Sequence, residues 1–370
     1  MFDFKVIARD RDTEARAGVF TTPHGEIETP CFMPVATLAN VKTMTPKELV
    51  EIGVNTVICN TLHLYTRPGV EIIEKAGGLH KFMGWERPIV TDSGGFQVFS
   101  LSDIREIKED GVVFASPFDG SKHLLTPEKV LEIQYSLGSD IIHPLDICPP
   151  YPVSKKEAEK AVKKTIEWAR ISKKIHEERG THQALFGIVQ GSTYHDLRKL
   201  AVEETVSLEF DGYSIGGVAV GESKEELLDI SSYTASLLPE DKIRYLMGVG
   251  EPRDLLDCIS FGVDLFDCVI PTRNGRTGTL YTWHGKINIK NAKYKEDFSP
   301  IDENCSCYVC RTFTRAYLRH LFVTHELLAQ RLGTIHNLHF FMELMREARE
   351  HIKKGDFKEW SEKVKGGMHG

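Results

Sequence analysis

The stretch LFGIVQGSTYHDLRKLAVEETVSLEFDGYSIGG, residues 185–217, contains one complete unit of the pattern that decides the fold. An apolar run at 185–189 leads into polar and glycine residues, then into a helix-like stretch, and then into a second apolar run at 212–215. This alternation is typical of a parallel α/β fold, because parallel strands are joined by crossovers that are usually helical.

The same rhythm runs through most of the chain. Further apolar runs that we predict as strands lie at 31–35, 56–59, 89–91, 141–145, 245–248 and 265–268. Helix starts are marked by Thr126-Pro127, by Ser154 with Glu157 and by Ser223 with Glu226. Eight strands predict a closed (β/α)₈ TIM barrel.

Two stretches interrupt the alternation. One is 98–125, which contains a strand-like run at 111–115, and the other is 272–333. We therefore predict a barrel formed by residues 1–271 and 334–370, with a small strand-containing insertion near 98–125. Residues 272–333 are predicted to form a second insertion, a small subdomain.

Composition limits the class of protein. The 370 residues are 41% hydrophobic and 27% charged, which is ordinary for a soluble globular protein. The chain lacks a secretory signal at its start and an apolar run long enough for a membrane span, so we expect a cytoplasmic protein without a membrane partner. The net charge of −7 argues against a uniformly basic nucleic-acid binder. Between Arg273 and Arg331, however, Lys and Arg outnumber Asp and Glu, which suits a partner that touches one face only.

Polar and glycine residues follow most of the predicted strands at their C-terminal ends, where barrel enzymes place their chemistry. They are Asn60, Asp92, Asp146, Gln190, Gly216-Gly217, Gly248-Val249-Gly250 and Asp267. Asp, Gly and Gln are also common loop residues. That alternative does not explain three carboxylates and a glutamine on the same side.

Three cysteines form a metal-binding pattern. Cys305, Cys307 and Cys310 lie within six residues, and closely spaced thiolates at a turn converge on Zn²⁺. A disulfide framework would leave one of them unpaired. His320, His325, His336 and His339 are candidates for the fourth ligand. We favour His336, which follows a predicted helix C-cap at Gly333, and four protein ligands imply a structural ion.

Two carboxylates at the predicted barrel mouth suit chemistry at a glycosidic carbon. Asp92 follows a strand and precedes the glycine turn of TDSGGFQ, residues 91–97, and Asp267 ends the last strand. In such a pair one carboxylate attacks and the other handles protons.

On the basis of these residues, the chain resembles the bacterial-type tRNA-guanine transglycosylases, the queuosine-pathway enzymes. The shared motifs include residues 91–97, Asp146 with Cys148, 187–191, 216–222, 245–250, 267–278 and the Cys cluster with His336. The resemblance implies a barrel with a zinc-bearing insertion that binds tRNA, closed by His336. It further implies exchange of guanine at the wobble position of U-G-U anticodons for preQ1.

The resemblance also implies roles for individual residues. Asp267 is the nucleophile that forms a covalent RNA intermediate, and Asp92 is the general acid/base. The base would be read by Asp146, Gln190 and Gly217 between the faces of Phe96 and Met247. The full substrate-binding set is Ser93, Gly94, Gly95, Phe96, Asp146, Gln190, Gly217 and Met247. The implied RNA contacts are Gly248, Val249, Gly250, Glu251, Pro252, Arg253, Asp254, Thr272, Arg273, Asn274, Gly275 and Arg276.

In the family that the chain resembles, the base that is accepted follows the size of the pocket near the positions of Cys148 and Val220. A valine at 220 leaves less room than a glycine, which favours preQ1 over the bulkier queuine. The chain departs from the family pattern at Ile147, where glutamate is usual, at His143-Pro144 and at Val218.

Two rival functions stay open at this point, a non-catalytic tRNA-binding subunit and a glycoside hydrolase. The first conflicts with the presence of both Asp92 and Asp267, and the second gives no role to a basic zinc subdomain. Family behaviour implies a homodimer formed through the zinc region.

Overall fold

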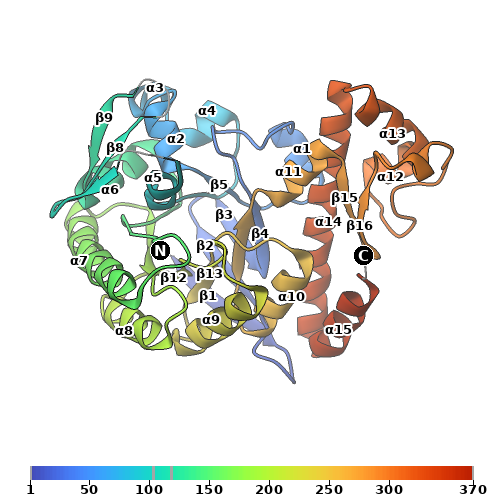
Figure 1. The fold of residues 1–370 in the computed structure, drawn as a ribbon. Helices are drawn as coiled ribbons and strands as arrows, with labels where there is room; N and C mark the ends of the chain where they lie inside the picture. Colours follow the sequence, from blue (N-terminus) through green and yellow to red (C-terminus); the bar gives the residue numbers. More distant parts are fainter. Residues whose placement is uncertain (1, 102–104, 117–119, 369–370) are drawn as a thin grey trace.

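The computed structural model describes residues 2–101, 105–116 and 120–368. Its centre is an eight-stranded parallel sheet whose strands follow one another around a barrel in chain order (Figure 1). The barrel closes between its first two strands, through a parallel bridge between Val35 and Ile58 and a hydrogen bond from Ala36 N–H to Ile58 O at 2.7 Å. The strands are β4 (Cys31–Pro34), β5 (Val57–Cys59), β6 (Ile89–Thr91), β10 (Ile141–Ile142), β11 (Ala184–Val189), β12 (Gly212–Ile215), β13 (Ile243–Leu246) and β14 (Leu265–Cys268).

The predicted barrel is thus confirmed, and two of its strands differ from the predicted bounds by more than one residue. The strand predicted at 141–145 stops at Ile142, and the one predicted at 245–248 is shifted to Ile243–Leu246. Alternate residues of each strand point into the barrel. Met33, Val90, Ile141, Phe186, Tyr245 and Leu265 belong to this buried interior cluster.

Helices surround the barrel and pack on the outward side chains of its strands. They are α1 (Pro46–Glu51), α2 (Thr61–Thr66), α3 (Val70–Lys75), α4 (Leu79–Met83), α5 (Gly95–Leu101), α6 (Pro127–Leu137), α7 (Lys155–Arg179), α8 (His195–Val206), α9 (Lys224–Leu237) and α10 (Pro252–Ser260). The predicted starts are confirmed: Thr126, Ser154 and Ser223 each accept a hydrogen bond at the N-cap of α6, α7 and α9.

An antiparallel sheet that the sequence analysis did not predict closes the N-terminal end of the barrel. It consists of β1 (Asp3–Arg9), β2 (Arg16–Thr22) and β3 (Gly25–Thr29). Phe20 and Ile27 from this sheet enter the interior cluster, where the Phe20 ring lies edge-on to Phe186 at 5.5 Å. The buried Arg16 pairs with Asp264, which precedes β14, at 2.6 Å. With one end plugged in this way, only the C-terminal end is left for a site.

A second small sheet lies in the predicted insertion at 98–125. It is formed by β7 (Arg105–Ile107), β8 (Val112–Ala115) and β9 (Lys122–Leu125), and β8 is the strand predicted at 111–115. Residues 102–104 and 117–119 of this stretch lie outside the described residues.

The chain after β14 lies along one side of the barrel, orange to red in Figure 1. It contains α11 (Ile270–Thr277), β15 (Thr279–Thr282), β16 (Gly285–Asn288), η1 (Ala292–Tyr294), α12 (Tyr308–Thr312), α13 (Arg315–Val323), α14 (Leu327–Lys354) and α15 (Phe357–Gly367). Gly333 was predicted to end a helix, and that prediction was wrong. It lies inside α14, so the predicted division between 333 and 334 falls within this helix.

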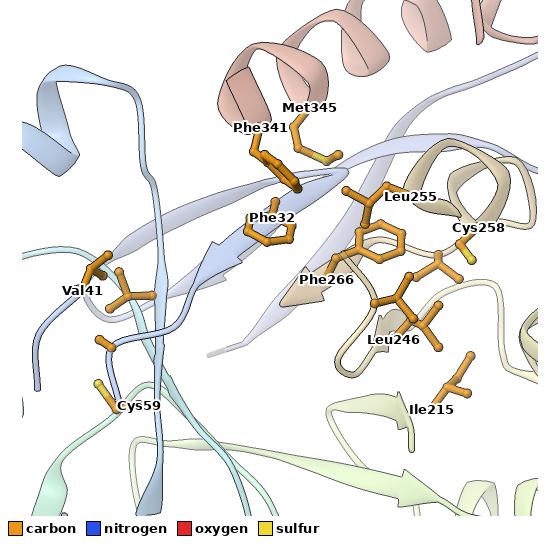
Figure 2. Close-up of a cluster of buried hydrophobic side chains, with 14 of the residues drawn as sticks. Phe32, Val41, Cys59, Ile215, Leu246, Leu255, Cys258, Phe266, Phe341 and Met345 are labelled. Atoms are coloured by element: carbon orange, nitrogen blue, oxygen red, sulfur yellow. The ribbon is translucent and has the colours of Figure 1, made fainter. Parts of the chain in front are cut away.

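Helix α14 joins this region to the barrel through apolar contacts. Figure 2 shows Phe341 and Met345 of α14 against Phe32 of β4, and the Phe32 and Phe341 rings are 4.8 Å apart. The same cluster continues through Phe266 and Leu246 to Leu255 of α10. Across the described ranges, no helix has the length and apolar character needed to cross a membrane.

Candidate active site and metal centre

The two predicted catalytic carboxylates meet at the open end of the barrel because of strand alternation. Asp267 is two residues beyond the inward-facing Leu265, and Asp92 is two residues beyond the inward-facing Val90. Both side chains therefore continue the inward phase of their strands at the C-terminal end. The negative charge of Asp92 contributes to the pKa of Asp267, so each lies within the electrostatic reach of the other.

Asp92 is held by three neutral donors. Its Oδ2 accepts from Asn60 Nδ2 at 2.6 Å and from Gln97 Nε2 at 2.7 Å, and its Oδ1 accepts from Thr61 N–H at 2.8 Å. Asn60 follows β5, and Thr61 begins α2. The carboxylate is thus fixed in orientation without a cationic partner.

Within the described part of the chain, the hydrogen bonds to Asp267 all fall on one oxygen. Its Oδ1 accepts from the Tyr245 hydroxyl at 2.6 Å and from Gly248 N–H at 2.9 Å. Tyr245 faces the barrel interior from β13, so the nucleophile candidate is supported from the neighbouring strand. Sequence analysis did not assign Tyr245 a role, since an inward-facing tyrosine in a strand is expected to be part of the hydrophobic core.

Burial raises the pKa of both carboxyl groups above the ordinary aspartate value. The hydrogen bonds from Tyr245 and Gly248 counteract this at Asp267, whereas the charge of Asp92 adds to it. Carboxyls with a raised pKa at a barrel mouth are suited to proton transfer and covalent chemistry.

Asp146 forms a second buried polar group beside these two. Its Oδ1 accepts from Ser93 Oγ at 2.6 Å, and its Oδ2 accepts from Gln190 Nε2 at 2.7 Å. Gln190 Oε1 is buried and has no hydrogen-bond partner among the described residues. An orphan acceptor of this kind is expected to find its partner in a ligand.

Gly217 lies directly against Gln190. Its φ of +69° is in the left-handed region, and a Cβ there would come within 2.2 Å of Gln190 Oε1. The loop carrying Gly216 and Gly217 is fixed from α8 by the buried Arg198, which donates to both of their carbonyl oxygens at 2.7 and 3.1 Å. Sequence analysis missed Arg198, because nothing distinguishes it from other charged residues of an amphipathic helix.

The two side chains predicted to enclose the base, Phe96 and Met247, have different surroundings. Phe96, at the start of α5, is 51% exposed, and Met247 is half-buried against the interior cluster. Gly94 and Gly95 form the turn between Asp92 and Phe96, and Gly95 N–H donates to Ser93 Oγ at 3.0 Å. Phe96 is therefore free to cover a ligand, while Met247 belongs to the floor.

The predicted RNA contacts divide into exposed and buried groups. Arg273 and Gly248 are exposed, whereas Val249, Gly250, Thr272 and Gly275 are buried. Residues 271–276 belong to helix α11. Gly275 packs on α14, where its missing side chain lets the two helices touch.

The metal-ligand candidates also come together. Cys305, Cys307, Cys310 and His336 place their ligand atoms within 4.8 Å of one another. His336 Nδ1 is 3.5 Å from Cys307 Sγ and 3.4 Å from Cys310 Sγ. His336 Nε2 donates to the Tyr281 carbonyl at 2.7 Å, which fixes the tautomer and leaves Nδ1 free to bind a metal.

A second His and Asp group, made of His24, His80 and Asp140, has a different geometry. The two imidazole rings stack at 3.5 Å, and His24 Nδ1 lies 2.7 Å from the buried Asp140 carboxylate. His80 Nε2 lies 3.3 Å from the other oxygen of the same carboxylate. We read this group as a polar contact between the N-terminal sheet and the barrel.

Comparison with known proteins agrees with this site. A family model described as queuine tRNA-ribosyltransferase matches residues 10–369. A queuine tRNA-ribosyltransferase of Caldanaerobacter subterraneus subsp. tengcongensis is 56% identical over 359 residues, which are 97% of this chain and 96% of the relative. That of Thermoanaerobacter pseudethanolicus is 57% identical over 95% of this chain and 93% of its own length. That of Aquifex aeolicus is 54% identical over 98% of each. The chain belongs to the queuine tRNA-ribosyltransferase family.

Proposed function

We propose that this chain exchanges guanine at the wobble position of tRNAs with a U-G-U anticodon for preQ1, in queuosine biosynthesis. The observation that carries the proposal is the pair of buried carboxylates at the barrel mouth, each held by neutral donors, beside the Asp146 and Gln190 group. Together with the family, this pair supports an active enzyme over a non-catalytic subunit.

Asp267 is the nucleophile in the proposed reaction. Its two hydrogen bonds fall on Oδ1, so Oδ2 attacks C1′ of the nucleotide. The C1′–O bond forms as the C1′–N9 bond breaks, and guanine leaves with a proton from Asp92. PreQ1 then gives its N9 proton to Asp92 and attacks C1′, which releases Asp267. Two displacements at one carbon retain its configuration.

Asp146, Gln190 and Gly217 are the proposed reading groups for the base. The Asp146 carboxylate accepts from the N–H groups of the guanine edge, and the orphan Gln190 Oε1 gives the pocket a second polar contact. Phe96 covers the base from the rim, opposite Met247. Such groups reject a base that leaves them unpaired.

The size of this pocket supports preQ1 as the incoming base. Val220 lies in the loop after Gly217, where its N–H donates to Glu222 Oε2 at 3.0 Å. This bond fixes the backbone at Val220, and Cys148, the second residue that the resemblance connects with pocket size, is buried. A bulkier base such as queuine would need the space that the valine occupies.

The Cys305, Cys307, Cys310 and His336 site is proposed to hold one zinc ion. Three thiolates and one imidazole close a tetrahedral shell, so the ion is structural and takes no part in the exchange. It would tie the loop before α12 to α14 and support residues 272–333 as the tRNA-contacting insertion. Arg273 and Arg276 on α11 are the proposed phosphate contacts beside the target base.

We further propose a homodimer through the metal-bearing region. Large apolar side chains are exposed there on α12, α13 and the start of α14. They are Tyr308, Tyr317, Val323, Leu327 and Leu328. A hollow of about 530 Å³ adjoins them, lined in part by Glu48, Tyr308 and Leu328. Exposed apolar groups clustered in this way mark protein interfaces, and a second copy is the occupant we propose.

The proposed function is tested with Asp267→Asn. We expect the wild-type chain to insert labelled guanine or preQ1 into a tRNA with a U-G-U anticodon and to form a covalent RNA adduct, located at Asp267 by mass spectrometry. Asp267→Asn should lose both while retaining tRNA affinity, because the amide keeps the shape but cannot attack. Undiminished exchange in the variant would remove Asp267 from the mechanism. Release of sugar from an oligosaccharide, without any effect on tRNA, would instead select a glycoside hydrolase.

A further inference from the structure

His143 lies fully buried in the barrel interior, beneath the two carboxylates. It follows the inward-facing Ile141 by two residues and therefore points inward itself. Its ring lies 5.8 Å from the ring of Tyr245, the residue that donates to Asp267. The proposed mechanism gives this histidine no role.

The backbone at His143 has left the sheet. Its N–H donates to Gln134 Oε1 at 3.0 Å, and its carbonyl accepts from Gln134 Nε2 at 2.7 Å. A glutamine side chain from α6 thus takes both bonds that a neighbouring strand would make. This explains why β10 contains only two residues, although the sequence predicted a strand through Leu145.

The departure of β10 leaves the Thr91 carbonyl without a backbone donor on that side. The pairing of β6 with β10 consists of Ile141 opposite Val90. His143 Nδ1 supplies the missing donor to Thr91 O at 2.7 Å. Thr91 is the residue before Asp92, whose own N–H donates to Cys59 O at 3.3 Å on the other side.

The hydrogen bonds determine the protonation of the ring. Because a carbonyl only accepts, Nδ1 carries the proton, and Nε2 accepts from Ser214 Oγ at 2.8 Å. Burial lowers the pKa of His143 to about 4, so the imidazole is neutral under the conditions of catalysis. A neutral ring with one fixed tautomer behaves as a permanent hydrogen-bond donor aimed at the Thr91 to Asp92 peptide.

We propose that His143 is a positioning residue for Asp92, which fixes the Thr91 to Asp92 peptide and thereby the direction of the proton-transferring carboxylate. The inference rests on the proposed function, because Asp92 is the group that it orients. Asn60, Thr61 and Gln97 hold the carboxylate itself, whereas His143 holds the backbone from which it extends.

Two matched variants separate this role from simple packing. Asparagine at 143 can place its amide nitrogen near the position of Nδ1 and keep the donor to Thr91 O. Glutamine at 143 can reach Ser214 but places no donor at that position. Both lose the ring, and glutamine fills more of the space, so packing alone predicts that His143→Gln is the milder change.

The expected result is the reverse. His143→Asn should keep kcat for preQ1 exchange within about threefold of the wild type, and His143→Gln should lower it about tenfold or more. The KM for tRNA should stay within about threefold in both, because His143 contacts no substrate. Equal kcat losses in the two variants, or a milder loss in His143→Gln, would overturn the proposal.

A third variant tests the proposal even where the histidine variants fold poorly. Ser214→Ala removes the donor to Nε2 and leaves the imidazole and its bond to Thr91 in place. We expect kcat within about threefold of the wild type. A loss of tenfold or more in Ser214→Ala would overturn the proposal. The wild-type chain, assayed alongside, tests the proposed function itself, because absence of exchange there would reject it. If the wild type is active and the variants lose kcat in another order than expected, only the role of His143 is rejected.

Discussion

The buried carboxylates at the two ends of the barrel have different partners. Asp264, near the N-terminal end, is paired with the guanidinium of Arg16 at 2.6 Å. Asp92 and Asp267, at the open end, receive hydrogen bonds from neutral groups only. A cationic partner lowers the energy of a carboxylate and makes it a poor nucleophile, whereas neutral donors orient it without removing its charge. The partner therefore distinguishes the ion-paired carboxylate Asp264 from the two that we propose to react.

The hydrogen bond from Tyr245 to Asp267 leads to a pH-dependent prediction. Exchange needs the carboxylate form of Asp267, so activity falls as pH drops through its pKa. Burial raises this pKa, and the Tyr245 hydroxyl lowers it by stabilising the charged form. Tyr245→Phe removes that donor, so the pKa should rise and the acid limb of kcat against pH should move to higher pH. We also expect kcat to fall about 10- to 100-fold.

Tyr213→Phe is the matched control. Tyr213 is equally buried but packs outside the barrel, with its hydroxyl 3.5 Å from the Val206 carbonyl. It should leave the acid limb in place. An unmoved limb in Tyr245→Phe would show that the hydroxyl does not control the protonation of Asp267.

Sequence alone predicted the site residues that end strands and missed those that support them. Strand ends bring Asp92, Asp146 and Asp267 to one face whatever the details of the helices. Arg198 and Tyr245 act through contacts across neighbouring elements, which no local pattern encodes. The role of His143 depends on the early end of β10, whereas the sequence predicted a strand that continued through His143 to Leu145.

At the scale of elements, the contact between α11 and α14 depends on two glycines. A Cβ added at Gly333 would lie 2.2 Å from the Gly275 carbonyl oxygen, which is backbone and cannot rotate away. Gly333→Ala should therefore push the helices apart and destabilise the protein by about 1–3 kcal/mol. His336 lies one turn further along α14, so metal content should also fall.

Gly366→Ala serves as the control for that change. Gly366 lies in helix α15, and a Cβ there meets nothing within 4 Å. Alanine favours helix over glycine, so this variant should be unchanged or stabilised by up to about 1 kcal/mol. Thermal unfolding and metal analysis measure both effects. Equal stability of the two variants would show that the α11 and α14 backbones can separate at little cost.

The metal site gives a second prediction at this scale. Cys307→Ser removes one of three thiolates, and we expect zinc and tRNA affinity to be lost together, because the ion orders the region that carries the basic residues. Cys258→Ala is the control, since its buried thiol lies on α10, away from the cluster. Elemental analysis and a tRNA binding assay give the two readouts. Full zinc in the serine variant would exclude Cys307 as a ligand.

Helix bounds in this region illustrate what sequence could not determine. Glycine at 333 was taken as a helix end because glycine commonly follows the last helical turn. In α14 it serves a tertiary purpose, the close approach to α11, and tertiary contact overrides the local preference. The N-terminal sheet was missed for a related reason. Its strands are antiparallel and do not belong to the repeating strand–helix pattern, and the sheet is stabilised by its contact with the end of the barrel.

At the scale of the whole molecule, the barrel has one open end, and the metal-bearing region stands beside it with an exposed apolar face. Leu327 is 81% exposed at the start of α14, next to Leu328 and four residues after the exposed Val323 of α13. Contiguous exposed apolar side chains mark a protein interface. A second copy that covered this face would leave both open barrel ends accessible, so that one subunit could orient the tRNA whose base the other exchanges.

Leu327→Lys tests this arrangement. A lysine in the centre of an apolar interface has no partner there, so the dimer should weaken by about 100-fold or more, measured by sedimentation of the zinc-loaded protein over a range of concentrations. Exchange should decline through a higher KM for tRNA, with the covalent adduct still forming at saturating tRNA. Ile171→Lys adds the same charge at a 43% exposed position on α7 and should change neither property. The proposed dimer would be rejected if the wild-type chain sediments as a monomer at assay concentrations. It would also be rejected if the Leu327→Lys variant remains as dimeric as Ile171→Lys.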